Sequence, residues 1–280
     1  MKLGQVDLKL LSDGQFLVDA GGIFGLVPRL LWGQFFSVDE TNRMPNDLAC
    51  LLIQSEGKRI LVDTGLGSKL TPREQAQQGI QRPGGGLAEE LRQRGLLPGD
   101  IDIVINTHLH WDHAGGNTMI VDGRAVPAFP NAEYWVQRLE WADAMYPNER
   151  TRNTYYPSNL LPLLESGQVR LLNGDTRVTR HVRCQVTRGH TRAHQSVFIE
   201  SEGQTAIFLG DMASMAIRFE RLGWMSAFDS EPLETLETKR AVREWALEHD
   251  ALLFFQHDVA TPVGRLVRDG ESVRVVPQAH

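Results

Sequence analysis

Apolar and polar residues alternate along much of the chain, and short glycine-containing turns repeatedly interrupt this pattern. A period of two followed by such a turn is typical of β-hairpins, because successive side chains of a strand point to opposite faces of a sheet. The pattern predicts four hairpins. They cover residues 6–22, 48–65, 196–211 and 265–276, with turns at Asp13-Gly14, Ser55-Glu56-Gly57, Ser201-Glu202-Gly203 and Asp269-Gly270.

The second and third hairpins resemble each other in sequence. Both contain the pattern Ile-x-Ser-Glu-Gly, at residues 53–57 and 199–203, and in both the second strand runs into an aspartate, Asp63 or Asp211. This is a weak internal repeat, and chance similarity is the alternative explanation. The repeat fits a domain built from two similar halves.

Helical patterns alternate with the strands. Residues 85–95 place two leucines four positions apart and end at Gly95, as a helix C-terminus does. Residues 231–250 begin with a proline and acidic residues, which favour a helix N-terminus. The apolar runs at 101–107 and 251–258 predict buried strands. The inward-facing stripe of the second helix is expected at Ala241, Val242, Trp245 and Ala246.

Residues 21–47 fit neither period. The stretch is rich in apolar and aromatic residues, but glycines and prolines break every regular spacing. It is either a loop that packs on the core or an apolar surface that forms a pocket wall or a dimer contact, since exposed apolar patches usually bind something. We expect one mixed α/β domain over residues 1–280, with an N-terminal hairpin and this apolar loop in residues 1–46.

Composition and charge exclude some classes of protein. The net charge of −6 and the pI of about 5.9 argue against a nucleic-acid-binding surface, which needs clustered lysine and arginine. Charged residues interrupt the N-terminus where a signal peptide is apolar, and no run is long enough for a membrane span. We therefore expect a cytoplasmic protein. Cys50 and Cys184 lack metal-binding spacing and are expected to be buried thiols.

The motif NTHLHWDHAGG at residues 106–116 places three histidines and an aspartate within six positions. It follows the predicted strand at 101–107, and ligand sites in α/β sheets lie at the carboxyl ends of strands. Histidines two positions apart can face one ion only in a bent loop, and the two glycines that end the motif permit such a bend. The candidate metal ligands are His108, His110, Asp112 and His113.

Four residues are more than one ion needs from a single loop, so further ligands or a second ion are expected. Three polar residues elsewhere in the chain meet this need. His190 follows the strand-like run at 182–187, Asp211 ends the third hairpin, and His257 ends the apolar strand at 251–258. Because a polar residue directly after a buried run lies at the rim of a sheet, the combination predicts a metal centre.

These residues resemble the metallo-β-lactamase superfamily. The family pattern is similar to His-x-His-x-Asp-His at 108–113 followed by the three downstream residues, and the similarity covers roughly residues 45–260. The resemblance implies an αββα sandwich, in which two mixed sheets are faced by helices. It also implies that His108, His110 and His190 bind a first metal, that Asp112, His113 and His257 bind a second, and that Asp211 bridges both. Asp63, in the sequence LVDTG, is a further family mark near the site.

Within the superfamily, the chain resembles the lactonase and methyl-parathion-hydrolase-like branch. True β-lactamases usually carry a secretion signal, lack the histidine after the aspartate and have a cysteine where Asp211 stands. Residues 33–53 and 210–258 are similar to the lactonase branch. Typical acyl-homoserine-lactone lactonases have a tyrosine three residues after the bridging aspartate, whereas this chain has Ser214, and the sequence leaves open whether Ser214 replaces it.

The resemblance implies a dinuclear metal-dependent hydrolase that attacks a lactone, a carboxyl ester or a phosphotriester with a hydroxide held between two divalent ions. Zinc is the expected metal, and manganese, iron and cobalt are the alternatives. A divalent ion is expected because it lowers the pKa of bound water to about 7. Asp112 is the expected catalytic residue, since it can also transfer a proton to the leaving group. Two alternatives stay open, a mononuclear iron dioxygenase acting on thiol persulfides and a metal-binding protein without catalysis.

Other residues near the centre have two interpretations each. His194 and Asp258 either orient the ligands or are ordinary polar residues. The substrate pocket, if apolar, favours small molecules with acyl or aryl groups, and a homodimer is a further option. Six aromatic residues either line this pocket or belong to the core, namely Phe24, Trp32, Phe36, Phe219, Trp224 and Phe228.

Overall fold

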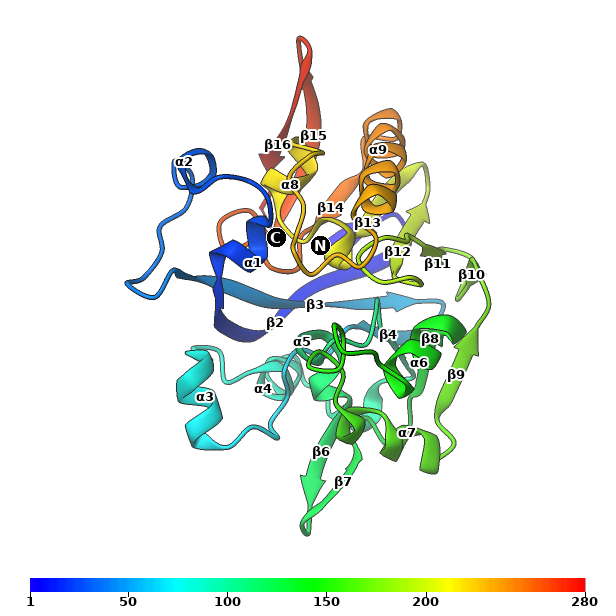
Figure 1. Ribbon diagram of the computed structural model, residues 1–280. Helices are drawn as coiled ribbons and strands as arrows, with labels where there is room; N and C mark the ends of the chain where they lie inside the picture. Colours follow the sequence, from blue (N-terminus) through cyan, green and yellow to red (C-terminus); the bar gives the residue numbers. More distant parts are fainter. Residues whose placement is uncertain (280) are drawn as a thin grey trace.

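The computed structural model describes residues 1–279 and contains two seven-stranded mixed sheets that pack face to face (Figure 1). The first sheet has the spatial order β1 (Lys2–Leu3), β2 (Val6–Asp19), β3 (Arg43–Ser55), β4 (Lys58–Val62), β5 (Ile103–Ile105), β8 (Glu133–Gln137) and β9 (Val169–Leu172). The second has the order β10 (Thr176–Arg177), β11 (Val182–Val186), β12 (Gln195–Ser201), β13 (Gln204–Phe208), β14 (Leu252–Phe254), β15 (Val263–Asp269) and β16 (Ser272–Pro277). Within the sheets, β4–β5, β5–β8, β8–β9 and β13–β14 pair in parallel.

Helices cover the outer faces of both sheets, which gives the expected αββα sandwich (Figure 1). The helices beside the first sheet are α3 (Pro72–Gln78), α4 (Leu87–Arg92), α5 (Trp111–Ala114), α6 (Arg138–Met145) and α7 (Leu161–Glu165). Those beside the second are α8 (Ala216–Glu220) and α9 (Pro232–Glu248), while α1 (Ala20–Phe24) and α2 (Arg29–Trp32) precede β3. A small separate hairpin joins β6 (Thr118–Val121) to β7 (Arg124–Pro127), and short 3₁₀ turns lie at η1 (Pro98–Asp100), η2 (Gly115–Asn117), η3 (Pro157–Asn159) and η4 (Gly210–Ala213). Among residues 1–279, none of the helices combines the length and the hydrophobicity that a membrane span requires.

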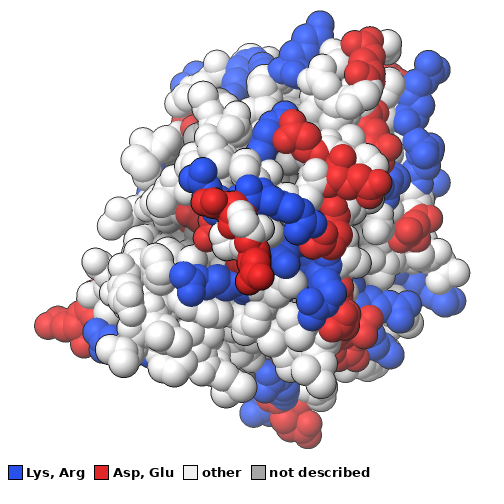
Figure 2. Space-filling model, turned by 90° about the horizontal axis from the view of Figure 1, so that it is seen from above, with Lys and Arg blue, Asp and Glu red and all other residues white. Residues whose placement is uncertain are grey.

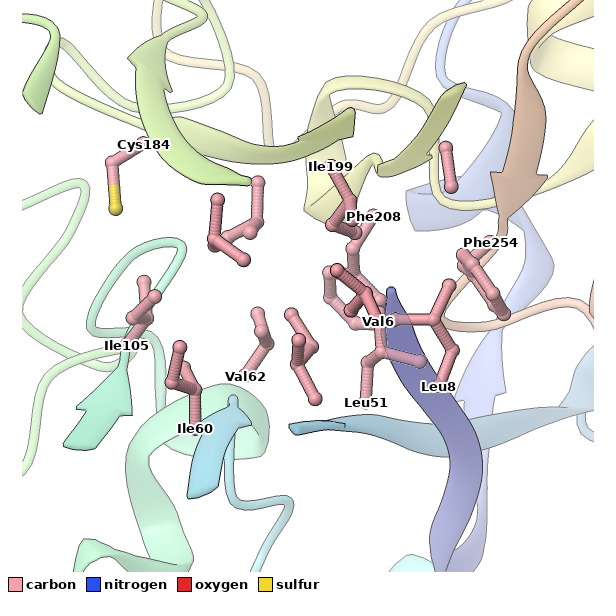
Figure 3. Packing of buried hydrophobic residues seen from close by; sticks show 14 of the residues in the cluster. Val6, Leu8, Leu51, Ile60, Val62, Ile105, Cys184, Ile199, Phe208 and Phe254 are labelled. Atoms are coloured by element: carbon pink, nitrogen blue, oxygen red, sulfur yellow. The ribbon is translucent and has the colours of Figure 1, made fainter. Parts of the chain in front are cut away.

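The core between the sheets is a continuous apolar layer. Side chains from β2, β3, β4 and β5 meet side chains from β11, β12, β13 and β14 in this layer (Figure 3). Its buried members include Val6, Leu8, Leu51, Ile60, Val62, Ile105, Cys184, Ile199, Phe208 and Phe254. Each fully buried aliphatic or aromatic side chain contributes about 1.5–3 kcal/mol. This layer therefore fixes one sheet against the other, and with it the loops at the edges of the sheets.

Three of the four predicted hairpins are confirmed, but the first is wrong. The chain does not turn at Asp13-Gly14, because β2 continues through these residues as one strand with a bulge between Ser12 and Gln15. The bulge turns the Asp13 side chain inward, where its carboxylate accepts hydrogen bonds from the backbone N–H groups of Leu66 and Leu87. Asp-Gly, which usually marks a tight turn, forms a β-bulge within a continuous strand in this protein.

The predicted helices are present, with a correction to α9. Thr235, Lys239, Val242 and Ala246 form the buried face of α9, whereas Ala241 is exposed. Residues 21–47, for which no regular element is predicted, contain the short helices α1 and α2 and the start of β3. The exposed apolar side chains of this stretch are Leu26, Leu30, Leu31 and Phe35. A dimer contact formed by these side chains stays a prediction. Cys50 and Cys184 are free and buried, as expected.

Surface charges of both signs are mixed on the face shown in Figure 2. Among the surface ion pairs of the described residues are Arg183 with Glu200 at 3.0 Å and Arg192 with Asp143 at 2.5 Å. Exposed pairs of this kind contribute only about 0–1 kcal/mol each, so the fold depends on its apolar layers and not on them.

Two glycines after the histidine motif allow the loops that follow β4 and β5 to touch through their backbones. A Cβ atom on Gly115 would lie 2.4 Å from the carbonyl oxygen of Leu66, and one on Gly116 would lie 2.2 Å from the carbonyl oxygen of Thr64. Neither distance is compatible with a side chain. The two glycines are predicted to permit a bend, and they also allow the two loops to pack closely against each other.

Replacing Gly116 by alanine should lower the free energy of unfolding by about 1–3 kcal/mol, because the added methyl group forces the two loops apart. Urea denaturation followed by circular dichroism measures this change. The matched control is Gly223→Ala, because a Cβ atom at Gly223 meets nothing within 4 Å. Equal stability of the two variants would contradict the packing role of Gly116.

Candidate metal centre

Seven polar side chains meet where strands of both sheets end. His108 and His110 follow β5, Asp112 and His113 lie in α5, His190 lies between β11 and β12, Asp211 lies in η4, and His257 follows β14. Parallel pairing of β4 with β5 and of β13 with β14 places the carboxyl ends of these strands at a common edge of each sheet. The core between the sheets then brings the two edges together, so four separate segments of the chain, at residues 108–113, 190, 211 and 257, build one site.

The ligand atoms form adjacent groups, and the atoms within each group lie within 4.8 Å of one another. One group contains His108, His110 and His190, and another contains Asp112, His113 and His257. The Asp211 carboxylate faces both groups. Its Oδ2 atom lies 3.3 Å from Nε2 of His190, while its Oδ1 atom lies 3.2 Å from Nε2 of His257 and 3.4 Å from Nε2 of His113.

Three buried ligand atoms have no hydrogen-bond partner among residues 1–279: Nε2 of His108, Nε2 of His113 and Oδ1 of Asp211. Leaving such an atom unpaired inside a protein costs about 1–3 kcal/mol. Imidazole nitrogens and carboxylate oxygens in this combination are ligands of zinc and similar divalent ions. The residues present therefore fit a pair of divalent ions, with Asp211 between them.

The metal-free site divides its histidines into two kinds. Burial and the neighbouring imidazoles hold the pKa of His108 and of His110 well below the usual value, so both rings are neutral. Burial also opposes charge on His113 and His257, but the Asp211 carboxylate more than offsets it and raises the pKa of both rings. In the absence of metal, these two rings balance the negative charge of Asp211.

Hydrogen bonds to the outer ring nitrogens orient two of the histidines. Nδ1 of His190 lies 2.8 Å from Oδ1 of the buried Asp229 carboxylate, and Nδ1 of His257 lies 2.7 Å from the carbonyl oxygen of Asp47. Such partners fix the tautomer of a ligating ring and direct its Nε2 lone pair inward. Both rings are thus prepared to bind through Nε2.

Asp63 and His194 lie directly behind the ligands. Oδ2 of Asp63 lies 3.0 Å from Nδ1 of His113, and Oδ1 accepts a hydrogen bond from the backbone N–H of Thr107 at 2.8 Å. Nε2 of His194 accepts a hydrogen bond from the backbone N–H of Asp211 at 3.0 Å, and burial lowers the pKa of His194 to about 3. Each of the two therefore holds one ligand in place.

Two supporting carboxylates were not identified from the sequence. One is Asp229, and the other is Glu140 in α6, which accepts hydrogen bonds from the backbone N–H of Leu109 at 2.9 Å and from the hydroxyl of Thr191 at 2.5 Å. Glu140 thereby ties the loop of His108 and His110 to the loop of His190. Neither carboxylate ends a strand or belongs to a metal motif, so the sequence carries no signal for them. Asp258, in contrast, accepts a hydrogen bond from the Ala216 backbone.

The metal groups open into a pocket with one apolar wall. Of the six predicted aromatic residues, only Phe228 lines this pocket. Phe24, Trp32, Phe36 and Trp224 instead form an adjacent aromatic cluster, and Phe219 is buried in the core under α9, so the pocket prediction is corrected for these five. Apart from the candidate metal ligands, the lining consists of five apolar and five other polar residues. The apolar lining residues are Phe16, Val18, Ile23, Trp111 and Phe228, and the polar ones besides the ligands are Asn46, Thr154, Ser214, Arg218 and Ser226.

The profile of the Metallo-beta-lactamase superfamily matches residues 45–259, more than three quarters of the chain. The chain therefore belongs to this superfamily, as a hydrolase of the lactonase-like kind. Among its relatives is the N-acyl homoserine lactonase of Bacillus cereus, which is 31% identical over 225 residues covering 77% of this chain and 82% of the relative.

Solved structures agree with this assignment. A probable metal-dependent hydrolase from Staphylococcus aureus has a TM-score of 0.90 and 27% sequence identity, with coverage of 100% of this chain and 99% of that chain. An N-acyl homoserine lactone hydrolase with the product N-hexanoyl-L-homoserine bound at its catalytic metal centre has a TM-score of 0.70 and 25% identity, with coverage of 92% and 95%.

Replacing Asp229 by asparagine should lower the affinity for zinc about 10- to 100-fold, because the neutral amide no longer supports the His190 ring electrostatically. Competition with a chromogenic chelator measures this affinity. Asp143→Asn is the matched control, since Asp143 is paired with Arg192 at the surface. Unchanged affinity in the Asp229 variant would show that the contact with His190 does not support metal binding.

Zinc binding should release protons, because His113 and His257 carry raised pKa values in the metal-free site and a ligating ring must be neutral. The apparent affinity should therefore rise with pH and fall as the pH drops. Calorimetric titrations in two buffers with different ionisation enthalpies, at one pH, count the protons. A binding enthalpy that is identical in both buffers would contradict the expected protonation.

Proposed function

We propose that this protein is a two-metal hydrolase that opens lactone rings. The convergence of seven imidazole and carboxylate side chains, three of which present unpaired buried atoms to a common centre, is the observation that supports this function most strongly. His108, His110 and His190 would hold one ion, Asp112, His113 and His257 would hold the other, and Asp211, whose carboxylate faces both groups, would contribute to each. A mononuclear iron dioxygenase needs only one group of metal ligands, so that function would leave the second group unexplained.

The chemistry requires a nucleophile and a proton donor at the mouth of the pocket. Divalent ions at these positions would supply a hydroxide nucleophile at neutral pH and polarise the substrate carbonyl. Zinc suits this set of imidazole and carboxylate ligands. The Asp112 side chain lies at the pocket wall and is 16% exposed, more than His113 beside it. From there Asp112 can take a proton from the attacking water and pass it to the alkoxide oxygen that leaves when the acyl C–O bond of the ring breaks.

The lactone substrate is inferred from the relatives and from the pocket. The relatives named above act on N-acyl homoserine lactones. In this protein, the apolar side chains that line the pocket provide a surface for an acyl chain, namely Phe16, Val18, Ile23 and Phe228. Aryl esters and phosphotriesters remain the other substrate classes to compare. We also propose a small-molecule substrate only, without a nucleic-acid partner.

The test is hydrolysis of N-hexanoyl-L-homoserine lactone, an aryl ester and a phosphotriester by the zinc-reconstituted protein, together with elemental analysis. We expect two ions per chain and the highest kcat/KM on the lactone. Replacing Asp211 by alanine should reduce the metal content and lower kcat/KM by at least about a thousandfold, because both ions lose a shared ligand. Asp7→Ala, an exposed change on β2, is the control. One redox-active iron per chain, or full turnover after exhaustive chelation, would refute the proposal.

A further inference from the structure

A second cavity of about 240 Å³ lies beside the pocket at the metal centre, and the chemistry above does not use it. His110, Thr154 and Phe228 line both spaces, so the two are neighbours. The pocket at the metal centre measures only about 80 Å³, whereas sites for drug-sized molecules commonly measure about 300–1,000 Å³. A substrate that is larger than its reacting ring therefore extends beyond the metal centre, and the second cavity is adjoining space that it can enter.

Arg150 determines the charge of the second cavity. No acidic side chain belongs to its lining, and burial keeps the His110 ring neutral. The residues that line the cavity besides Arg150 are His110, Thr151, Thr154, Ala227 and Phe228. A group that enters this cavity therefore meets one positive charge and no negative one.

Backbone carbonyls hold the Arg150 guanidinium at one end. Its Nη2 atom donates a hydrogen bond to the carbonyl oxygen of Ala227 at 2.7 Å and to that of Asp229 at 3.3 Å. The side chain is exposed, and no carboxylate among residues 1–279 forms an ion pair with it. Since a guanidinium has five N–H donors, the remaining ones are available to a ligand. Arg150 is thus a positioned cation without a counter-charge.

A carboxylate is the ligand that suits such a cation. Hydrogen bonds between a guanidinium and a carboxylate are charge-assisted and roughly twice as strong as neutral ones. The anchored Nη2 atom also reduces the side-chain entropy that binding would otherwise cost. The proposed reaction offers two sources of a carboxylate, a substituent of the lactone and the acid that ring opening creates.

We propose that the second cavity is a carboxylate subsite in which Arg150 is the cationic group, and that it extends the metal pocket past Phe228. The subsite favours compounds that are anionic at this position over neutral compounds of the same shape. This inference rests on the proposed lactonase function and adds a charge preference that the apolar wall of the metal pocket does not provide.

The first arm of the test compares lactones in the zinc-loaded enzyme. The substrates are γ-butyrolactones with an α-alkyl chain that ends in a carboxylate, in a series of chain lengths, each beside the carboxamide of equal shape. At the chain length that reaches Arg150, the wild type should prefer the carboxylate, and Arg150→Gln should lower this preference in kcat/KM about three- to tenfold. Arg150→Lys keeps the charge and should retain part of the preference. Added salt should weaken the preference of the wild type.

The second arm measures binding of the product without turnover. Calorimetry compares the ring-opened acid of α-hexyl-γ-butyrolactone with its carboxamide, in the wild type and in Arg150→Gln. Because any metal contact of the acid is present in both proteins, the difference between the two proteins isolates the contribution of Arg150. A loss in the first arm identifies a substrate substituent as the source of the carboxylate, and a loss in the second identifies the product.

The matched control is Arg152→Gln, which removes an exposed arginine from the same loop. Elemental analysis verifies that Arg150→Gln still holds its metals, since Arg150 also bonds to the Asp229 backbone. Equal losses on carboxylate and carboxamide, or no loss in either arm, would refute the subsite while the lactonase function stands. A wild-type enzyme that opens no lactone would refute the lactonase function, and calorimetry would still decide for or against the subsite.

Discussion

The structure depends on a small set of buried nitrogen and oxygen atoms that have been removed from water without being given a hydrogen-bond partner. His108, His113 and Asp211 each present such an atom to one centre. A fold can sustain this only if something else makes the arrangement rigid, since free side chains would rotate to find hydrogen bonds. Here the rigidity comes from the apolar layer between the sheets, which brings the ends of β5 and β14 together and leaves the ligating loops little freedom.

Hydrogen bonds behind the ligands complete this rigidity. Asp63 and Asp229 form hydrogen bonds with Nδ1 of two imidazole rings, His194 accepts a hydrogen bond from the backbone of Asp211, and Glu140 joins two loops from different sheets. All of these groups are buried, and each forms a hydrogen bond with the group that it positions. A site of this kind is formed before any ion or substrate arrives, which reduces the ordering that binding has to bring about.

The sequence predicted which polar side chains converge better than it predicted their surroundings, for a physical reason. Histidine and aspartate directly after an apolar run mark the rim of a sheet, and this local signal identified His190, Asp211 and His257 at large separations in the chain. The turn-like Asp13-Gly14 was misassigned because a bulge and a hairpin use the same residues. The sequence left six aromatic residues open between pocket and core, because periodicity does not distinguish a core face from a cavity wall, and only Phe228 lines the pocket. Asp229 and Glu140 act only through contacts that tertiary packing creates.

The bulge in β2 has a consequence for how the molecule comes apart. Asp13 accepts hydrogen bonds from the backbone of Leu66, Gly67 and Leu87, and the Gly67 backbone in turn packs against Gly116. The N-terminal strand, the segment after β4 and the glycines of the histidine motif consequently form one cooperative unit. Partial unfolding that frees only the histidine loop would have to break this chain of contacts as well, so opening of that loop is coupled to opening of the N-terminal strand.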